Sequence, residues 1–197
     1  LYSNTSSIGN IAVGYRALRK NTAAGHNTAI GYQSLFSNTG SDNTAIGYNT
    51  LSSNTTGTVN TAVGSEVLQL NTTGYGNTAV GPSALFANTT GNSNSAFGGS
   101  ALGSNISGNH NIAMGVNSLL LNETGNRNVA LSTASLYNNS DGNANIGIGY
   151  FSLQRNESGS YNVAIGDSAA YSSINLSHLV AIGSKALFAN TGGTNLT

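Results

Sequence analysis

Hydrophobic and polar positions recur in the same order eleven times along this chain. Typical copies read NTAIGYQSLFSNTG, from Asn27, and NTAVGPSALFANTTG, from Asn77. Consecutive copies start 17 residues apart, except that 16 residues separate Asn27 from Asn43. A fixed short period indicates one small structural unit that is stacked many times. The copies start at Asn10, Asn27, Asn43, Asn60, Asn77, Asn94, Asn111, Asn128, Asn145, Asn162 and Leu179.

Positions two to five of each copy, counted from the leading Asn, are typical of a short β-strand; examples are residues 28–31, 44–47 and 61–64. Alternation places positions two and four on one face of the strand, and three and five on the other. Position four is always apolar, and position two is Thr from Thr28 to Thr78 and Ile or Val from Ile112 onward. We therefore predict that positions two and four face the interior of each coil.

The opposite strand face carries Ala at position three and Gly at position five, each in ten of the eleven copies. Side chains this small at a fixed place indicate that something packs closely against them. The packing partner is either the opposite wall of the same coil or another chain. We favour another chain, because columns of Ala and Gly would let thin rods associate side by side in a symmetric oligomer.

The remainder of each copy predicts a second wall and a turn. Positions six to eleven carry Leu at position nine as a second inward anchor, in either a second strand or a short helical turn, which periodicity over six residues does not separate. Asn at position twelve begins a segment such as NTTG, whose residues favour turns. The residue missing from the Asn27 copy falls in this segment, where a deletion is best tolerated.

These patterns together predict an all-β fold, a β-solenoid (β-roll) of about eleven 17-residue coils. Residues 1–197 form a single repeat array without a linker, and both ends fall part-way through a copy, which predicts a longer polypeptide. One coil cannot bury a core by itself, but stacked coils can. Eleven strands at about 4.8 Å spacing give a rod roughly 50 Å long, with recurring Asn side chains forming amide ladders.

The composition of the chain argues against several classes of function. Charged residues make up only 6% of the chain, and six basic residues balance six acidic ones. No basic stripe is present, so the electrostatic footprint of nucleic-acid binding is missing. The chain has no Cys, and no apolar stretch of the roughly 20 residues that a transmembrane helix needs.

The pattern NTAIGY-x-SL-xx-NTTG resembles the repeats of bacterial and phage proteins of the tail-fibre-domain type. Its N-x-A-I-G-x-x-S core is also similar to the head repeat of YadA-like trimeric autotransporter adhesins, whose unit is shorter and lacks the NTTG extension. These resemblances cover essentially the whole chain. They imply an extracellular, homotrimeric β-roll that serves as a stalk or an adhesive surface.

The repeat gives little evidence for a catalytic or metal-binding site. Glu123 and Glu157 occupy equivalent positions two coils apart, roughly 10 Å by stacking, near the spacing of an inverting glycosidase pair. They fall in the turn, whereas such a pair needs a buried cleft. His26, His110 and His178 share position seventeen, but their coils are too far apart for one chain to gather them on a metal. We predict no enzyme activity, no catalytic, cofactor-binding or metal site, and no cofactor.

Other columns suggest binding surfaces, each with a structural alternative. Tyr15, Tyr32 and Tyr48 align at position six, where rings either bind sugars or stiffen the rod. A second aromatic column at position ten contains Phe36, Phe86, Tyr137, Tyr171 and Phe188. Position-twelve Asn residues match the N-glycosylation pattern, which turn composition also produces: Asn54, Asn71, Asn88, Asn105, Asn122 and Asn156. Thr columns at positions two and thirteen suggest an ice-binding face. Ile and Val replace Thr at position two after Thr78, and Ile106, Glu123 and Glu157 interrupt position thirteen, which counts against a lattice-matching surface.

The leading hypothesis is a structural and adhesive segment of an extracellular fibre, surface filament or virion fibre. Its predicted partners are further copies of the same chain, as a homotrimer, and cell-surface glycans. The alternative is a binding module that presents a repeated face to glycans or ice.

Overall fold

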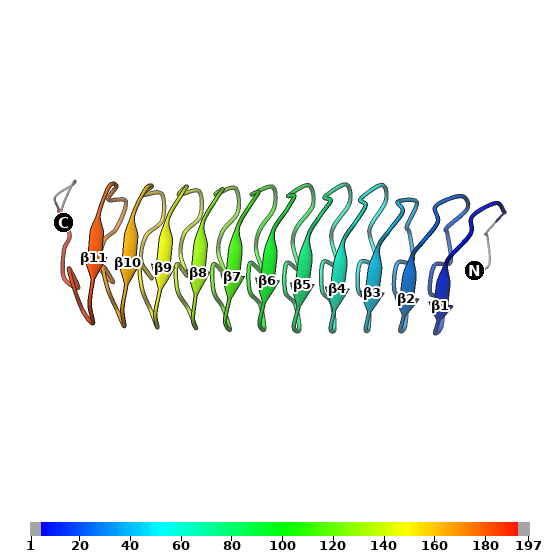
Figure 1. Ribbon diagram of the computed structural model, residues 1–197, viewed down its shortest axis with the longest axis horizontal. Helices are drawn as coiled ribbons and strands as arrows, with labels where there is room; N and C mark the ends of the chain where they lie inside the picture. Colours follow the sequence, from blue (N-terminus) through cyan, green and yellow to red (C-terminus); the bar gives the residue numbers. More distant parts are fainter. Residues whose placement is uncertain (1–4, 193–197) are drawn as a thin grey trace.

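The computed structural model describes residues 5–192, which contain eleven β-strands and no α-helix. The strands are β1 (Ile11–Val13), β2 (Thr28–Ile30), β3 (Thr44–Ile46), β4 (Thr61–Val63), β5 (Thr78–Val80), β6 (Ser95–Phe97), β7 (Ile112–Met114), β8 (Val129–Leu131), β9 (Ile146–Ile148), β10 (Val163–Ile165) and β11 (Val180–Ile182). One strand belongs to each copy of the repeat, and the coils follow one another along an elongated rod (Figure 1). Residues 1–4 and 193–197, which include the chain ends used to predict a longer polypeptide, lie outside this description.

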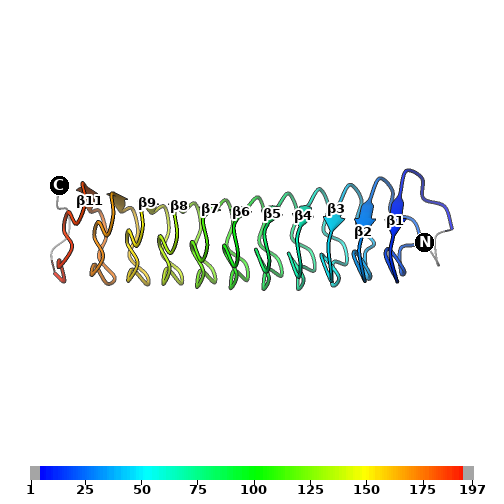
Figure 2. The same ribbon diagram turned by 90° about the horizontal axis from the view of Figure 1, so that it is seen from below.

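The eleven strands form a single parallel sheet in sequence order, so the fold is a β-solenoid. Equivalent residues pair from coil to coil: Ile30 lies beside Ile46, and Ile46 lies beside Val63. Register is kept across the 16-residue copy, where Thr28 pairs with Thr44. The predicted stacking is therefore confirmed, and both views show the coils in one continuous row (Figures 1 and 2).

Each strand has three residues rather than the predicted four, because the Gly at position five turns the chain. Gly31 has a φ of +132° and Gly47 one of +139°, in a region that L-residues with a side chain rarely adopt. A Cβ atom on Gly31 would also collide with the backbone carbonyl of Gly47 in the next coil. The Gly column therefore ends each strand and allows close coil-to-coil contact.

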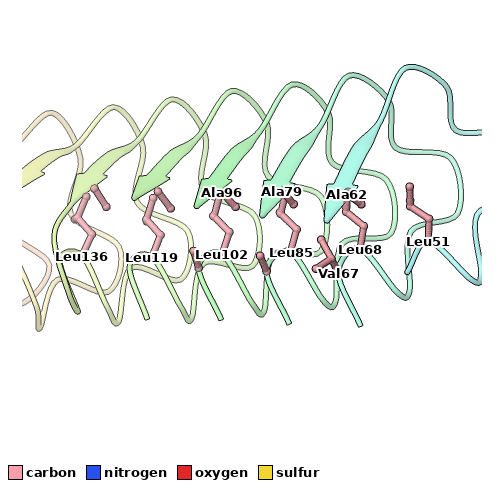
Figure 3. Close-up of a cluster of buried hydrophobic side chains, with 14 of the residues drawn as sticks. Leu51, Ala62, Val67, Leu68, Ala79, Leu85, Ala96, Leu102, Leu119 and Leu136 are labelled. Carbon is pink, nitrogen blue, oxygen red and sulfur yellow. The ribbon is translucent and has the colours of Figure 1, made fainter. Parts of the chain in front are cut away.

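The core consists of the position-three Ala column of the strands and the position-nine Leu column of the opposite wall. Ala62 and Leu68 are both 0% exposed, and Figure 3 shows them together inside one coil. The same pairing recurs along the rod, as Ala79 with Leu85 and as Ala96 with Leu102. A methyl group on the strand leaves room for one Leu side chain, which fills the narrow coil.

The predicted orientation of the strands is wrong. Positions two and four point outward, as shown by Ile30, which is 38% exposed, whereas Ala29 beside it is 0% exposed. The Ala residues pack against the coil's own opposite wall and the Gly residues against the next coil, so the close packing needs no second chain. The physical reason is space: a two-layer coil accommodates one Leu column, and branched side chains on the inner strand face would overfill it.

Positions six to eleven form neither of the two predicted structures. The backbone takes left-handed φ values at positions seven and nine, for example 53° at Gln33 and 51° at Leu35. As a result, the Gln33 N–H donates backward to the Tyr15 carbonyl (2.9 Å), and the Leu35 N–H donates forward to the Thr50 carbonyl (3.0 Å). This wall thus has its own inter-coil hydrogen bonds without extended strands.

Two buried Asn columns hold the turns, which confirms the predicted amide ladders. At position twelve, Asn71 Nδ2 donates to Asn54 Oδ1 of the preceding coil (2.7 Å) and to the Gly74 carbonyl of its own coil (3.0 Å). At position one, the Asn60 N–H donates to Asn43 Oδ1 (3.0 Å), and Asn60 Nδ2 donates to the same Gly74 carbonyl (2.9 Å). Over most of the rod, each ladder therefore ties a coil both to itself and to its neighbour; Ser173 ends the position-twelve ladder and Leu179 ends the position-one ladder.

Candidate functional site

The largest candidate surface is the outer face of the parallel sheet, formed by positions two and four of all eleven coils. We call it the strand face. It contains no charged residue. Its exposed large apolar side chains are Ile11, Val13, Ile30, Ile46, Val80, Phe97, Ile112, Met114, Ile165 and Ile182.

The size of the strand face sets it apart from isolated surface hydrophobics. Eleven strands at about 4.8 Å spacing and three residues at about 3.3 Å rise give a strip of roughly 50 by 10 Å, or about 500 Å². Contiguous apolar patches of this size on a monomer often mark an interaction site. The four Thr side chains of β2 to β5 also lie on this face, so one end of the strip combines hydroxyl and aliphatic groups.

The two glutamates singled out by spacing, Glu123 and Glu157, do line one hollow, together with Ser140 of the intervening coil and Arg155. Both glutamates are exposed. The hollow is shallow and open, so it lacks the closed cleft that excludes water from a glycosidase centre. The arrangement provides two hydrated carboxylates beside one guanidinium.

The three histidines are in separate environments along the rod. His26 Nδ1 lies 3.7 Å from Asp42 Oδ1, with both side chains largely exposed. His178 stacks on Tyr161, at 5.2 Å between ring centroids and 16° between ring planes. Within residues 5–192, no group of three or more His, Cys, Asp or Glu side chains is placed to hold a metal ion.

The position-six tyrosines form a continuous stack. Tyr15, Tyr32 and Tyr48 follow each other with centroids 5.4 Å apart and ring planes 21° and 14° from parallel. Each ring covers a face of the next, so the faces between them are closed to a sugar ring. At position ten, Tyr171 and Phe188 stack in the same way, with centroids 5.1 Å apart. Over these residues the aromatic columns favour stiffening of the rod.

The position-twelve Asn residues are unsuited to carry glycans in the folded chain. All six that match the glycosylation pattern are fully buried. Both Nδ2 hydrogens of Asn88, for example, are donated, to Asn71 Oδ1 (2.7 Å) and to the Gly91 carbonyl (3.0 Å). A glycan needs this same nitrogen and would occupy the coil interior, so its attachment is incompatible with the coil.

The two Thr columns differ in what they offer. At position thirteen, Thr55 Oγ1 donates to the Thr72 carbonyl (2.9 Å), and Thr72 Oγ1 donates to the Thr89 carbonyl (2.9 Å). These hydroxyl groups stabilise the turns. At position two the threonines point outward on the strand face, which makes them the Thr column available to a ligand.

No family model, characterised protein or solved structure matches this chain in sequence or fold comparisons. The resemblance to tail-fibre-type and adhesin-head repeats therefore stays a prediction. The described region also contains no helix of the length and apolarity that a membrane span requires.

Proposed function

We propose that this chain is a structural and adhesive segment of an extracellular fibre, in which copies associate side by side through the strand face. The main support is an uncharged, largely apolar strip that runs the full length of the rod. The core of the rod is already buried within the single chain, so this strip is not needed to complete it. Fully burying an exposed Ile or Val side chain is worth about 1.5–3 kcal/mol, and the partly exposed residues of the strand face gain a share of this. A column of such residues therefore gives every coil a favourable contact with a neighbouring chain.

The mechanism of such a segment is mechanical. Backbone ladders on two walls and two buried Asn columns couple each coil to the next, which resists bending and local opening. The chain has few charged side chains and no Cys, so it carries few chemically reactive groups. A homotrimer, the symmetry implied by the resemblance, would direct the three strand faces toward a common axis and leave the remaining walls for contact with surfaces.

The area supports the association. Two strand faces of about 500 Å² each bury about 1,000 Å² in total, which is the lower limit for a specific interface. The occupant that fits best is another copy of this chain, because only a surface with the same coil spacing matches the strip along its whole length. Enzyme activity forms no part of this proposal.

The test is the mass of the purified chain in solution by multi-angle light scattering. We expect an oligomer for the wild type and a monomer for the double variant Ile46→Lys/Phe97→Lys, whose new charges lie on the strand face. The matched control is Gln33→Lys/Leu70→Lys, which adds the same two charges outside the strand face. Leu70 is 41% exposed, so its replacement by Lys does not disturb the core. A monomeric wild type at millimolar concentration would contradict side-by-side association.

A second function is favoured by one specific observation, the outward Thr column of β2 to β5. Thr28, Thr44, Thr61 and Thr78 pair in register beside outward Ile and Val residues on a parallel sheet. Regularly spaced hydroxyl and methyl groups are suited to ordered water, so this end of the strand face could bind ice. Thermal hysteresis lost in Thr61→Lys and kept in Gln33→Lys would support it, and no hysteresis in the wild type would refute it.

A further inference from the structure

A hollow on the position-seventeen column provides a second surface, separate from the strand face. Positions sixteen and seventeen of four successive coils line it, and its volume is about 560 Å³. The position-seventeen residues here are His110, Arg127, Ala144 and Tyr161, in chain order along the rod. We call this hollow the axial slot.

Tyr161 forms one end of the axial slot. One face of its ring is covered by His178 of the next coil, at 5.2 Å and 16°. On the other side the equivalent residue is Ala144, whose methyl group is too short to cover a phenol ring. Tyr161 is 61% exposed, so the ring presents one open face along the rod axis.

Arg127 lies two coils from Tyr161, or about 10 Å at one strand spacing per coil, between Ala144 and His110, which forms the opposite end of the slot. Its side chain is exposed, and no ion pair engages it within residues 5–192. Guanidinium groups bind carboxylates through two parallel hydrogen bonds, which gives both strength and orientation. A ring placed about 4 Å from the Tyr161 face would therefore lie over Ala144 with Arg127 within reach of its far edge.

The polar groups in the floor of the slot are already hydrogen-bonded to one another. Asn126 Nδ2 donates to the Thr124 carbonyl (2.8 Å) and to Asn143 Oδ1 (3.1 Å). The Ala144 N–H donates to the Asn126 carbonyl (2.9 Å). A ligand would therefore be recognised by the Tyr161 face and the Arg127 guanidinium, which the ladder holds at a fixed separation.

From this geometry we propose that the axial slot binds a carboxylated sugar, with the pyranose ring stacked on Tyr161 and the carboxylate paired with Arg127. The C–H groups of a pyranose suit an open aromatic face, and the carboxylate supplies the anion that Arg127 lacks. A uronic acid and a sialic acid both have this chemistry. The inference does not rest on self-association, because none of these residues belongs to the strand face.

Tyr48 provides a matched control within the same chain. It is also an exposed tyrosine at the end of a stack, since Tyr32 covers one of its faces and the next residue in its column is Ser65. The residue that follows Ser65 is Glu66, so this second open ring has a carboxylate nearby rather than an arginine. If stacking alone were sufficient, Tyr48 would bind the same sugars.

The experiment measures binding of trigalacturonic acid and of 3′-sialyllactose to the full chain by ligand-observed NMR and calorimetry. Trigalacturonic acid methyl ester, which has the same rings without charge, is the ligand control. We expect at least one of the two acids to bind, with about tenfold weaker affinity in Tyr161→Ala and in Arg127→Gln and unchanged affinity in Tyr48→Ala. Which acid binds distinguishes a uronate polymer from a sialylated glycan as the source.

Circular dichroism identical to wild type will verify that these exposed substitutions leave the coils folded. Failure of both acids to bind the wild type at millimolar concentration would overturn the proposal. Equal binding of the methyl ester would overturn the role of Arg127, and unchanged affinity in Tyr161→Ala would overturn the stacking. Each result is independent of the oligomer mass that tests the proposed function.

Discussion

Asn71 donates a 2.7 Å hydrogen bond through Nδ2 to Oδ1 of Asn54, its equivalent in the preceding coil. Asn88 donates in turn to Asn71 Oδ1 at 2.7 Å, so each amide is both donor and acceptor in a buried column. Buried polar groups in such a network are costly to leave without partners. The ladder therefore makes the stability of one coil depend on its neighbours.

Replacing Asn71 by Leu should destabilise the chain strongly. The substitution removes two donated bonds, and it leaves Asn54 Oδ1 without its donor and one Asn88 Nδ2 hydrogen without its acceptor inside the coil. Each unsatisfied group costs about 1–3 kcal/mol, so we expect a loss of about 3 kcal/mol or more. Urea unfolding followed by circular dichroism measures it.

The control for this substitution is Thr73→Ala, two residues away on the exposed turn. It should shift the urea midpoint little. Equal midpoints for the two variants would mean that the Asn ladder contributes no more than an ordinary surface turn.

Truncation of a core leucine should distinguish the inner wall from the outer surface. Leu85 is 0% exposed and packs in the cluster with Ala79, whereas Leu70 is 41% exposed. We expect Leu85→Ala to cost about 2–5 kcal/mol through lost burial and a residual cavity, and Leu70→Ala to cost less than about 1 kcal/mol. Thermal unfolding of both variants, which have the same chemical change, compares them directly; similar melting temperatures would show that position nine does not form the core.

The Gly column gives a third prediction. Gly31→Val places a branched side chain at a φ of +132° and against the Gly47 carbonyl, so we expect a large fall in melting temperature or failure to fold. Gln33→Lys, on the outer surface two residues later, should be almost silent. Equal melting temperatures for these two variants would contradict the assignment of position five to the coil-to-coil contact.

The sequence predicted the stacking because the repeat period itself encodes it. Like residues recurring every 17 positions are brought side by side by any regular coil, which is how Ile30, Ile46 and Val63 come to be paired. The Asn ladders followed from the same argument. These features depend on periodicity rather than on the conformation of any one residue.

The orientation of the strands could not be predicted from residue type. The rule that larger apolar residues face inward places Ile30 inside and Ala29 outside, and the structure has the reverse. The rule fails because the interior has room for only one large column, already filled by Leu. The left-handed conformation of Leu35 could not be predicted either, because Leu rarely adopts it. In the solenoid, hydrogen bonds between coils compensate for its cost.

Only part of the axial slot could be predicted from the sequence. Alignment placed the histidines at position seventeen, but it did not show that His178 covers one face of Tyr161 or that Ala144 leaves the other face open. Those facts depend on side-chain reach along a column. A small residue between an aromatic and an arginine at the 17-residue period is the signal that could have revealed the slot.

The central claim, that each 17-residue copy adds one strand spacing along a straight rod, is best tested by distances between spin labels in this Cys-free chain. Labels on cysteines at Thr55 and Glu123, four coils apart, should lie about 19 Å apart, and labels at Thr22 and Glu157, eight coils apart, about 38 Å. Labelled chains are diluted with unlabelled ones, so that only distances within one chain are measured by double electron–electron resonance. A twofold ratio is the predicted result, and two similar distances would contradict the stacked solenoid.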